Sequence, residues 1–269
     1  MQVYTLYEGS YSVDASKKFI PFDPKIHQAK DRPASLFVHV QPFLVKFGSK
    51  LLLLDTGLGF SDDSGALILH QNIRRAGFNP DEVDYILMSH LHFDHAGGMV
   101  HRHGDKIELS FPQATYVINR GEWEAAYSSQ SRSYDREILD YLQRNASLDF
   151  IEGSGEYLPG IHYEFTGAHC PNHIVYLLGS LPDSTNASQN EQLTNPIFFG
   201  GDVWPEPEEI LRKFIAKYDY DGRLAMELRE KFAQRAISEN WKCLFYHAKT
   251  MSQAHIGKEG DKFLLQKID

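Results

Sequence analysis

Short apolar runs, separated by polar stretches that contain glycine or proline, are the dominant pattern along the chain. Apolar or alternating runs of about four to eight residues predict β-strands, and apolar residues three or four positions apart predict amphipathic helices. Strands are therefore expected within residues 1–12, 35–45, 50–54, 83–88, 107–109, 114–117, 161–164, 174–178, 197–199, 241–247 and 255–269. Helices are expected at residues 66–76, 121–128 and 134–145, and in much of 205–240 with a break at 220–222. The pattern predicts a protein that mixes helices and strands along its whole length.

Two long polar stretches carry no apolar period. Residues 13–33 contain several prolines and predict a long loop. Loops of this length within a compact domain are often functional, so this one is a candidate for the rim of an active site. Residues 181–195 are rich in serine, asparagine and glutamine, and predict an exposed hairpin loop rather than a domain boundary.

Composition narrows the classes of protein that fit. The 269 residues, 42% of them hydrophobic, suffice for one large domain or two small ones with a full core. The net charge of −9 argues against a nucleic-acid partner. The longest apolar runs fall far short of the ~20 residues of a membrane span, and the first ten residues do not resemble a signal peptide. The two cysteines, Cys170 and Cys243, imply no disulfide framework. We expect a cytoplasmic protein with no membrane partner.

The segment from Ser89 to Gly98 carries the densest candidate chemistry and directly follows the strand-like residues 83–88. Residues two apart in an extended segment project to one side, so neighbouring histidines here can face a common point. Imidazole nitrogen and carboxylate oxygen bind zinc at about 2.0–2.2 Å. A turn or surface role, which is usual for a lone histidine, does not explain four candidate ligands within six residues. The sequence predicts a metal site, with two ions side by side, at His90, His92, Asp94 and His95.

This His-x-His-x-Asp-His pattern, with Ser89 before it and Ala96-Gly97-Gly98 after it, resembles the signature of the metallo-β-lactamase superfamily, particularly its lactonase-like branches. The resemblance implies an α+β fold, a four-layer αββα sandwich of two mixed β-sheets flanked by helices, formed by residues 1–269 as a single domain. It also implies three further ligands in a set order: a histidine, a bridging aspartate and a final histidine.

Three later segments match that order. His169 lies in a Thr-Gly-x-His sequence between two predicted strands, with His173 as the alternative. Asp202 follows the apolar residues 197–199, and His247 ends the predicted strand 241–247. The resemblance then implies that Asp94 and Asp202 also take part in catalysis. It implies that one ion is held by His90, His92 and His169, the other by Asp94, His95 and His247, and that Asp202 bridges them.

The sequence Leu54-Asp55-Thr56-Gly57 is a second resemblance, because a buried strand ending in Asp-Thr-Gly is common upstream of the metal motif in this superfamily. The Asp55 carboxylate can accept a hydrogen bond from the far nitrogen of a ligand histidine, or it can cap its own turn. The sequence leaves both roles open.

The chemistry implied is that of a dinuclear zinc hydrolase. Two divalent ions, two carboxylates and a metal-bridging hydroxide leave one positive charge, which polarises a carbonyl or phosphoryl oxygen. Metal coordination lowers the pKa of water to about 7, so hydroxide is available at neutral pH. We expect cleavage of a small ester, lactone or thioester. Zinc is favoured because His92 stands where the di-iron branch of the superfamily has a carboxylate; iron and manganese stay open.

The substrate is the least determined part of this interpretation. Lactonase-like members often carry a tyrosine shortly after the bridging aspartate, whereas this chain has Val203, Trp204 and Pro205. Whether Tyr246 or His173 takes part in catalysis is open. One alternative is a phosphodiesterase of the same fold, for which Lys17, Lys18, Lys25 and Lys30 would bind the anion. Another is a mononuclear-iron enzyme that oxidises a thiol or persulfide. The partner expected is a small-molecule substrate, and the sequence does not predict an oligomeric state.

Overall fold

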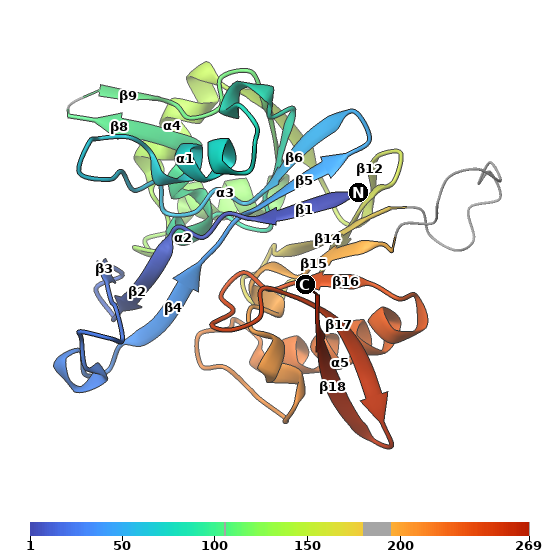
Figure 1. The fold of residues 1–269 in the computed structure, drawn as a ribbon. Helices are drawn as coiled ribbons and strands as arrows, with labels where there is room; N and C mark the ends of the chain where they lie inside the picture. Colours follow the sequence, from blue (N-terminus) through green and yellow to red (C-terminus); the bar gives the residue numbers. More distant parts are fainter. Residues whose placement is uncertain (105, 180–194, 269) are drawn as a thin grey trace. The chain divides into compact units, whose positions relative to one another are not determined.

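Figure 1 shows the fold as a computed structural model, in which residues 1–104, 106–179 and 195–268 are described. The chain divides into two compact units, Met1–Phe150 and Ile151–Asp269, and each unit is described by itself. Residues 181–194, for which the sequence predicts a loop, lie outside the described part of the chain. The single domain over residues 1–269 stays a prediction.

A six-stranded mixed sheet is the centre of the first unit. Its strands, in spatial order, are β1 (Gln2–Thr5), β5 (Phe43–Phe47), β6 (Lys50–Leu54), β7 (Tyr85–Leu87), β10 (Thr115–Asn119) and β11 (Ser147–Ile151). Strand β5 pairs antiparallel with β1 and β6, whereas β7 pairs parallel with both β6 and β10. Residues 51–54 of β6 are all buried, which explains the unbroken leucine run that predicted this strand.

Three helices pack on one face of this sheet: α1 (Ile68–Arg75), α3 (Arg120–Ser128) and α4 (Arg136–Asn145). Helix α4 illustrates the cause, because Ile138, Leu139 and Leu142 recur on one side of the helix and are all buried. The Asp135 carboxylate begins this helix by accepting a hydrogen bond from the Glu137 backbone N–H at 3.0 Å. The three predicted helices are confirmed to within two residues at either end.

The N-terminal region differs from the prediction. Residues 1–12 form two strands, β1 and β2 (Gly9–Val13), and residues 35–45 form β4 (Leu36–Val40) and most of β5. Proline has no N–H to donate to a ladder, and Pro42 separates β4 from β5. The prediction that 13–33 is wholly loop is also wrong. Within it lie β3 (Phe19–Pro21), which joins β2 and β4 in a three-stranded sheet, and a short 3₁₀ turn, η1 (Ala29–Asp31). A separate hairpin pairs β8 (Val100–His103) with β9 (Lys106–Leu109).

Glu8, between β1 and β2, is a buried carboxylate that organises a neighbouring loop. Its two oxygens accept hydrogen bonds from the backbone N–H groups of Leu58, at 2.6 Å, and Phe60, at 3.0 Å. Burial raises the pKa of Glu8 to about 7, although these backbone donors favour the charged form. The side chain is therefore partly protonated in the folded chain at neutral pH.

We expect the Glu8→Gln variant to lose part of the pH dependence of stability. An unfolded Glu8 releases its proton near its ordinary pKa of 4.5, whereas the folded group holds it to about pH 7. The native state thus binds the extra proton between these values, so its stability falls as pH rises through this window. The term amounts to about 2 kcal/mol between pH 5 and 7. Denaturant unfolding at both pH values measures it. The exposed Glu124→Gln is the control and should keep the wild-type decline; an equal decline in both variants would contradict the prediction.

The second unit is built on a seven-stranded mixed sheet whose spatial order follows the chain. Its strands are β12 (Gly155–Leu158), β13 (Ile161–Phe165), β14 (Ile174–Leu178), β15 (Ile197–Phe199), β16 (Lys242–Leu244), β17 (Gln253–Glu259) and β18 (Lys262–Lys267). Neighbouring strands pair antiparallel except β15 and β16, which are parallel. A parallel pair needs a crossover connection, and the chain between β15 and β16 provides it.

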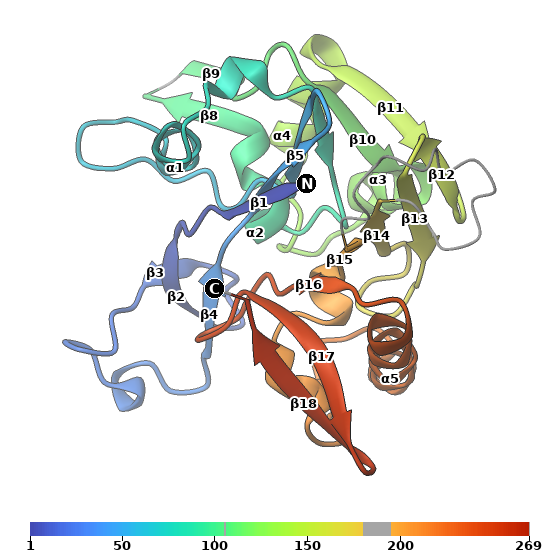
Figure 2. The same ribbon diagram turned by 45° about the vertical axis from the view of Figure 1, so that its right-hand side comes forward.

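Helix α5 (Gly222–Ser238) lies in that crossover and packs on one face of the sheet, beside β17 (Figure 2). Ala225, Phe232, Ala233 and Ala236 form its buried side. The prediction of helix across much of 205–240 is only partly confirmed. Before α5 the chain forms two short 3₁₀ turns, η4 (Gly201–Val203) and η5 (Pro207–Ile210). None of the described helices combines the length and the apolar character needed to cross a bilayer.

Candidate metal centre

The predicted metal motif follows β7 and winds through α2 (Phe93–Ala96) and the 3₁₀ turn η3 (Gly97–Met99). The turn is held against the end of β6, because Thr56 donates its backbone N–H and its hydroxyl to the His95 carbonyl, each at 2.7 Å. A Cβ atom on Gly98 would lie 2.0 Å from the Thr56 carbonyl oxygen, which no residue with a side chain can accommodate unmoved. The second glycine of the motif is thus explained by backbone packing.

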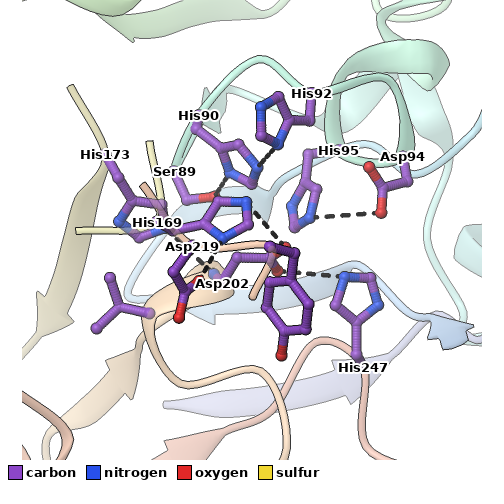
Figure 3. Close-up of polar contacts among 12 residues, drawn as sticks. Ser89, His90, His92, Asp94, His95, His169, His173, Asp202, Asp219 and His247 are labelled. Atoms are coloured by element: carbon purple, nitrogen blue, oxygen red, sulfur yellow. Dashed lines mark hydrogen bonds and ion pairs between the residues drawn. The ribbon is translucent and has the colours of Figure 1, made fainter. Parts of the chain in front are cut away.

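In the first unit, the candidate donor atoms of the motif lie in two pairs (Figure 3). His90 Nε2 lies 3.0 Å from His92 Nδ1, and His95 Nε2 lies 3.9 Å from Asp94 Oδ2. Ser89 Oγ donates its one proton to Asp55 and therefore accepts from His90 Nδ1, at 3.0 Å. This arrangement places the lone pair of His90 on Nε2, the atom beside His92 Nδ1.

Asp55 holds Nδ1 of His95 in the same way. His95 Nδ1 lies 2.6 Å from Asp55 Oδ2, and the Ser89 backbone N–H donates to Asp55 Oδ1 at 2.7 Å. The Asp55 side chain is fully buried, and burial raises its pKa although the neighbouring His95 opposes the shift. Of the two roles that the sequence left open for Asp55, the contacts support the one that orients a ligand histidine.

In the second unit, three predicted ligands come from three loops. His169 lies between β13 and β14, Asp202 lies in η4 after β15, and His247 follows β16. Asp202 Oδ2 is 3.4 Å from His169 Nε2, and Asp202 Oδ1 is 3.2 Å from His247 Nε2 (Figure 3). One carboxylate thus offers a different oxygen to each of two imidazoles, which is the arrangement expected of a bridging ligand.

His173, the alternative to His169, uses both ring nitrogens inside the protein. Its Nε2 accepts the Asp202 backbone N–H at 3.1 Å, and its Nδ1 lies 3.0 Å from Thr166 Oγ1. The ring therefore ties the His169 loop to the Asp202 turn and has no nitrogen to offer an ion. Tyr246 is buried, with its ring 5.0 Å from that of His247, and its part in catalysis stays open.

Two carboxylates that contact the candidate ligand segments, Asp219 and Glu122, were not predicted from the sequence. The Asp219 carboxylate lies 2.9 Å from His169 Nδ1, and no local signal marks it, because fifty residues separate the two. Glu122 is fully buried in α3, where it accepts hydrogen bonds from the Leu91 backbone N–H at 3.2 Å and the Tyr134 hydroxyl at 3.1 Å. A charged residue beside Trp123 on an apolar helix face was a signal that could have identified Glu122.

These donor sets fit a metal ion. Within each unit, the donor pairs lie 3.0, 3.9, 3.4 and 3.2 Å apart. A tetrahedral ion with ligands at about 2.0–2.2 Å places its donor atoms about 3.3–3.6 Å from one another, and the four distances lie in this range or within about 0.3 Å of it. Imidazole nitrogen with carboxylate oxygen suits zinc and, less selectively, iron or manganese.

Comparisons with known proteins agree with this geometry. An N-acyl homoserine lactonase from Bacillus cereus is 36% identical over 107 residues, which are 39% of this chain and only 37% of the lactonase. AidC, a dizinc quorum-quenching lactonase, superposes with a TM-score of 0.71 at 20% identity, covering 99% of this chain and 94% of AidC. The hydrolase AbOPH superposes with a TM-score of 0.72 at 21% identity, covering 100% and 94%. These two likenesses show the fold and confirm the predicted α+β class. Residues 37–181, more than half of the chain, match the metallo-beta-lactamase superfamily, and the protein belongs to that family.

Proposed function

We propose that this protein is a metal-dependent hydrolase that opens a small lactone, or cleaves a related ester or thioester, with two zinc ions. The observation that carries the proposal is Asp202, whose two oxygens approach the Nε2 atoms of two different histidines. The matched segment of N-acyl homoserine lactonase supports the lactone as the first substrate to try. We further propose that residues 1–269 act as one hydrolase domain.

The proposed ligand set follows the order of the family motif. Each of His90, His95 and His169 has its Nδ1 held by a side-chain oxygen, which places the lone pair of the ring on Nε2, the atom proposed to bind the ion. The proposed centre has one ion on His90, His92 and His169, a second on Asp94, His95 and His247, and Asp202 between them.

The ions would polarise the substrate carbonyl and lower the pKa of water to about 7. The chain supplies orientation and proton transfer. The Asp94 side chain is 15% exposed, so its carboxylate can accept a hydrogen bond from the attacking water and hold it in line. Asp202 fixes the two imidazoles. As the attacking water forms its bond to the carbonyl carbon, it can give a proton to the Asp94 carboxylate. The same proton can then pass to the alkoxide oxygen as the ring C–O bond breaks.

Nothing in the described residues favours the phosphodiesterase alternative. Lys17, Lys18, Lys25 and Lys30 are exposed, and carboxylates alternate with them: Asp14 pairs with Arg32, and Asp23 Oδ1 accepts the Lys25 backbone N–H. This loop therefore presents both signs of charge. Val203 and Trp204, after the bridging aspartate, are buried in the core of the second unit, so neither replaces the tyrosine of lactonase-like members.

The test is metal content by elemental analysis, combined with hydrolysis of a lactone, an ester, a thioester and a bis-phosphodiester. We expect about two zinc ions per chain and turnover of the lactone. The His247→Ala variant should retain about one ion, whereas the control His255→Ala should retain both, because His255 Nδ1 lies 2.8 Å from the Trp241 carbonyl oxygen in the core. Turnover of the phosphodiester alone would support the phosphodiesterase. A single iron per chain without hydrolysis would support the thiol- or persulfide-oxidising alternative.

A further inference from the structure

A buried carboxylate stands behind the proposed ligand His169. Asp219 Oδ1 lies 2.9 Å from His169 Nδ1, and the Asp219 side chain has no exposed surface. Its second oxygen has no hydrogen-bond partner among the described residues. A polar group buried in this way is costly unless it is hydrogen-bonded. Within the described residues, the ion pair found for Asp219 is with His169, so the imidazole ring is the group that accompanies its burial.

Backbone hydrogen bonds fix the same segment to the His169 loop. The N–H of Tyr220 donates to the His169 carbonyl at 3.0 Å, and the N–H of Asp221 donates to the Ala168 carbonyl at 2.8 Å. The Asp221 side chain in turn accepts the Leu224 backbone N–H at 3.0 Å and begins α5. The segment just before α5 is thus bonded to the His169 loop at three points: the Asp219 side chain and the backbone N–H groups of Tyr220 and Asp221. These bonds hold the Asp219 carboxylate beside the His169 ring.

A second set of contacts holds Tyr218, the residue before Asp219, through Glu209 and Arg229. The Tyr218 hydroxyl donates to Glu209 Oε1 at 3.1 Å, and Glu209 Oε2 pairs with Arg229 of α5 at 3.0 Å. Arg229 also donates to the Val203 carbonyl, next to Asp202, at 3.0 Å. Burial raises the pKa of Glu209 to about 8, against the attraction of Arg229. The residue before Asp219 is therefore connected to the residue after Asp202.

We infer that Asp219 is a positioning residue for His169. By accepting the Nδ1 proton it selects the tautomer whose lone pair lies on Nε2, and a carboxylate partner strengthens that nitrogen as a ligand. The inference rests on the proposed function, since it assigns Asp219 a task only if His169 binds an ion. It does not place Asp219 in contact with substrate.

The test compares Asp219→Asn, which keeps the shape and an acceptor oxygen but loses the charge, with Asp219→Ala, which removes both. Zinc affinity is measured by competition with a chromogenic chelator. We expect a loss of about 10- to 100-fold for the alanine variant and a smaller loss for the asparagine variant. In the metal-free protein, long-range ¹H–¹⁵N NMR reports the tautomer of His169, identified by its absence in His169→Gln. The signal should change from the Nδ1–H form to a mixture in Asp219→Ala.

Asp221→Asn is the matched control. It removes one charge two residues away, retains a side chain that caps α5, and should leave the zinc affinity and the His169 tautomer unchanged. Wild-type affinity and an unchanged tautomer in Asp219→Ala would overturn the role of Asp219 while leaving the proposed function intact. A wild-type chain that binds no zinc would overturn the proposed function and, with it, the role of Asp219.

Discussion

The Asp202→Ala variant should lose more than about 10³-fold in kcat/KM on the preferred substrate, a larger loss than removal of one oxyanion donor causes. Asp202 approaches both His169 and His247, so its truncation would remove a carboxylate ligand from both of the proposed ions. Steady-state kinetics and the zinc content of the purified variant measure the effect, and the zinc content should fall together with the rate.

The fold is expected to survive this change. The Asp202 backbone N–H donates to His173 Nε2, and alanine keeps this bond. Circular dichroism and the unfolding midpoint should therefore remain close to those of the wild type. Asp202→Asn is the companion variant, because it retains the shape and loses only charge. Full activity in the alanine variant would remove Asp202 from the proposed centre.

Arg229→Ala is expected to destabilise the protein by about 3–5 kcal/mol, because it leaves several buried acceptors without their donor at about 1–3 kcal/mol each. Arg229 is 1% exposed, and its loss isolates the Glu209 carboxylate and the carbonyls of Val203 and Phe214. Denaturant unfolding at pH 7 gives the change in the free energy of unfolding.

The control for Arg229 is Lys231→Ala in the same helix. Lys231 pairs with Glu164 at 2.6 Å, but its side chain is 53% exposed. Exposed pairs of this kind contribute about 0–1 kcal/mol, so this variant should remain close to the wild type. Equal losses in the two variants would mean that burial does not govern these ion pairs.

The features that could be predicted from sequence are local ones. The motif from Ser89 to Gly98 holds its candidate ligands within six residues, and the apolar runs that became β6 and β14 are continuous. The family order then pointed to His169, Asp202 and His247, and the structure places these three donors near one another within the second unit. That these three residues and the first motif bind metal at one centre stays a prediction.

The features that could not be predicted depend on tertiary contacts. Asp219 reaches His169 across fifty residues, from a charged stretch whose composition is typical of a solvated surface. Glu8 lies where residues 1–12 divide into two strands, and its carboxylate turns inward to accept hydrogen bonds from the backbone N–H groups of Leu58 and Phe60. From the local sequence alone, a carboxylate at this position is expected on the surface. Its burial is explained by the backbone donors, which lie far away in the sequence.

The parallel pairing of β15 and β16 has an evolutionary consequence. A single uninterrupted crossover, residues 200–241, contains Asp202, Asp219 and Arg229. A recombination event that exchanged this segment between relatives would transfer a ligand together with the groups that hold its neighbours in place. The crossover would thus be inherited as one unit, a ligand together with its supporting groups.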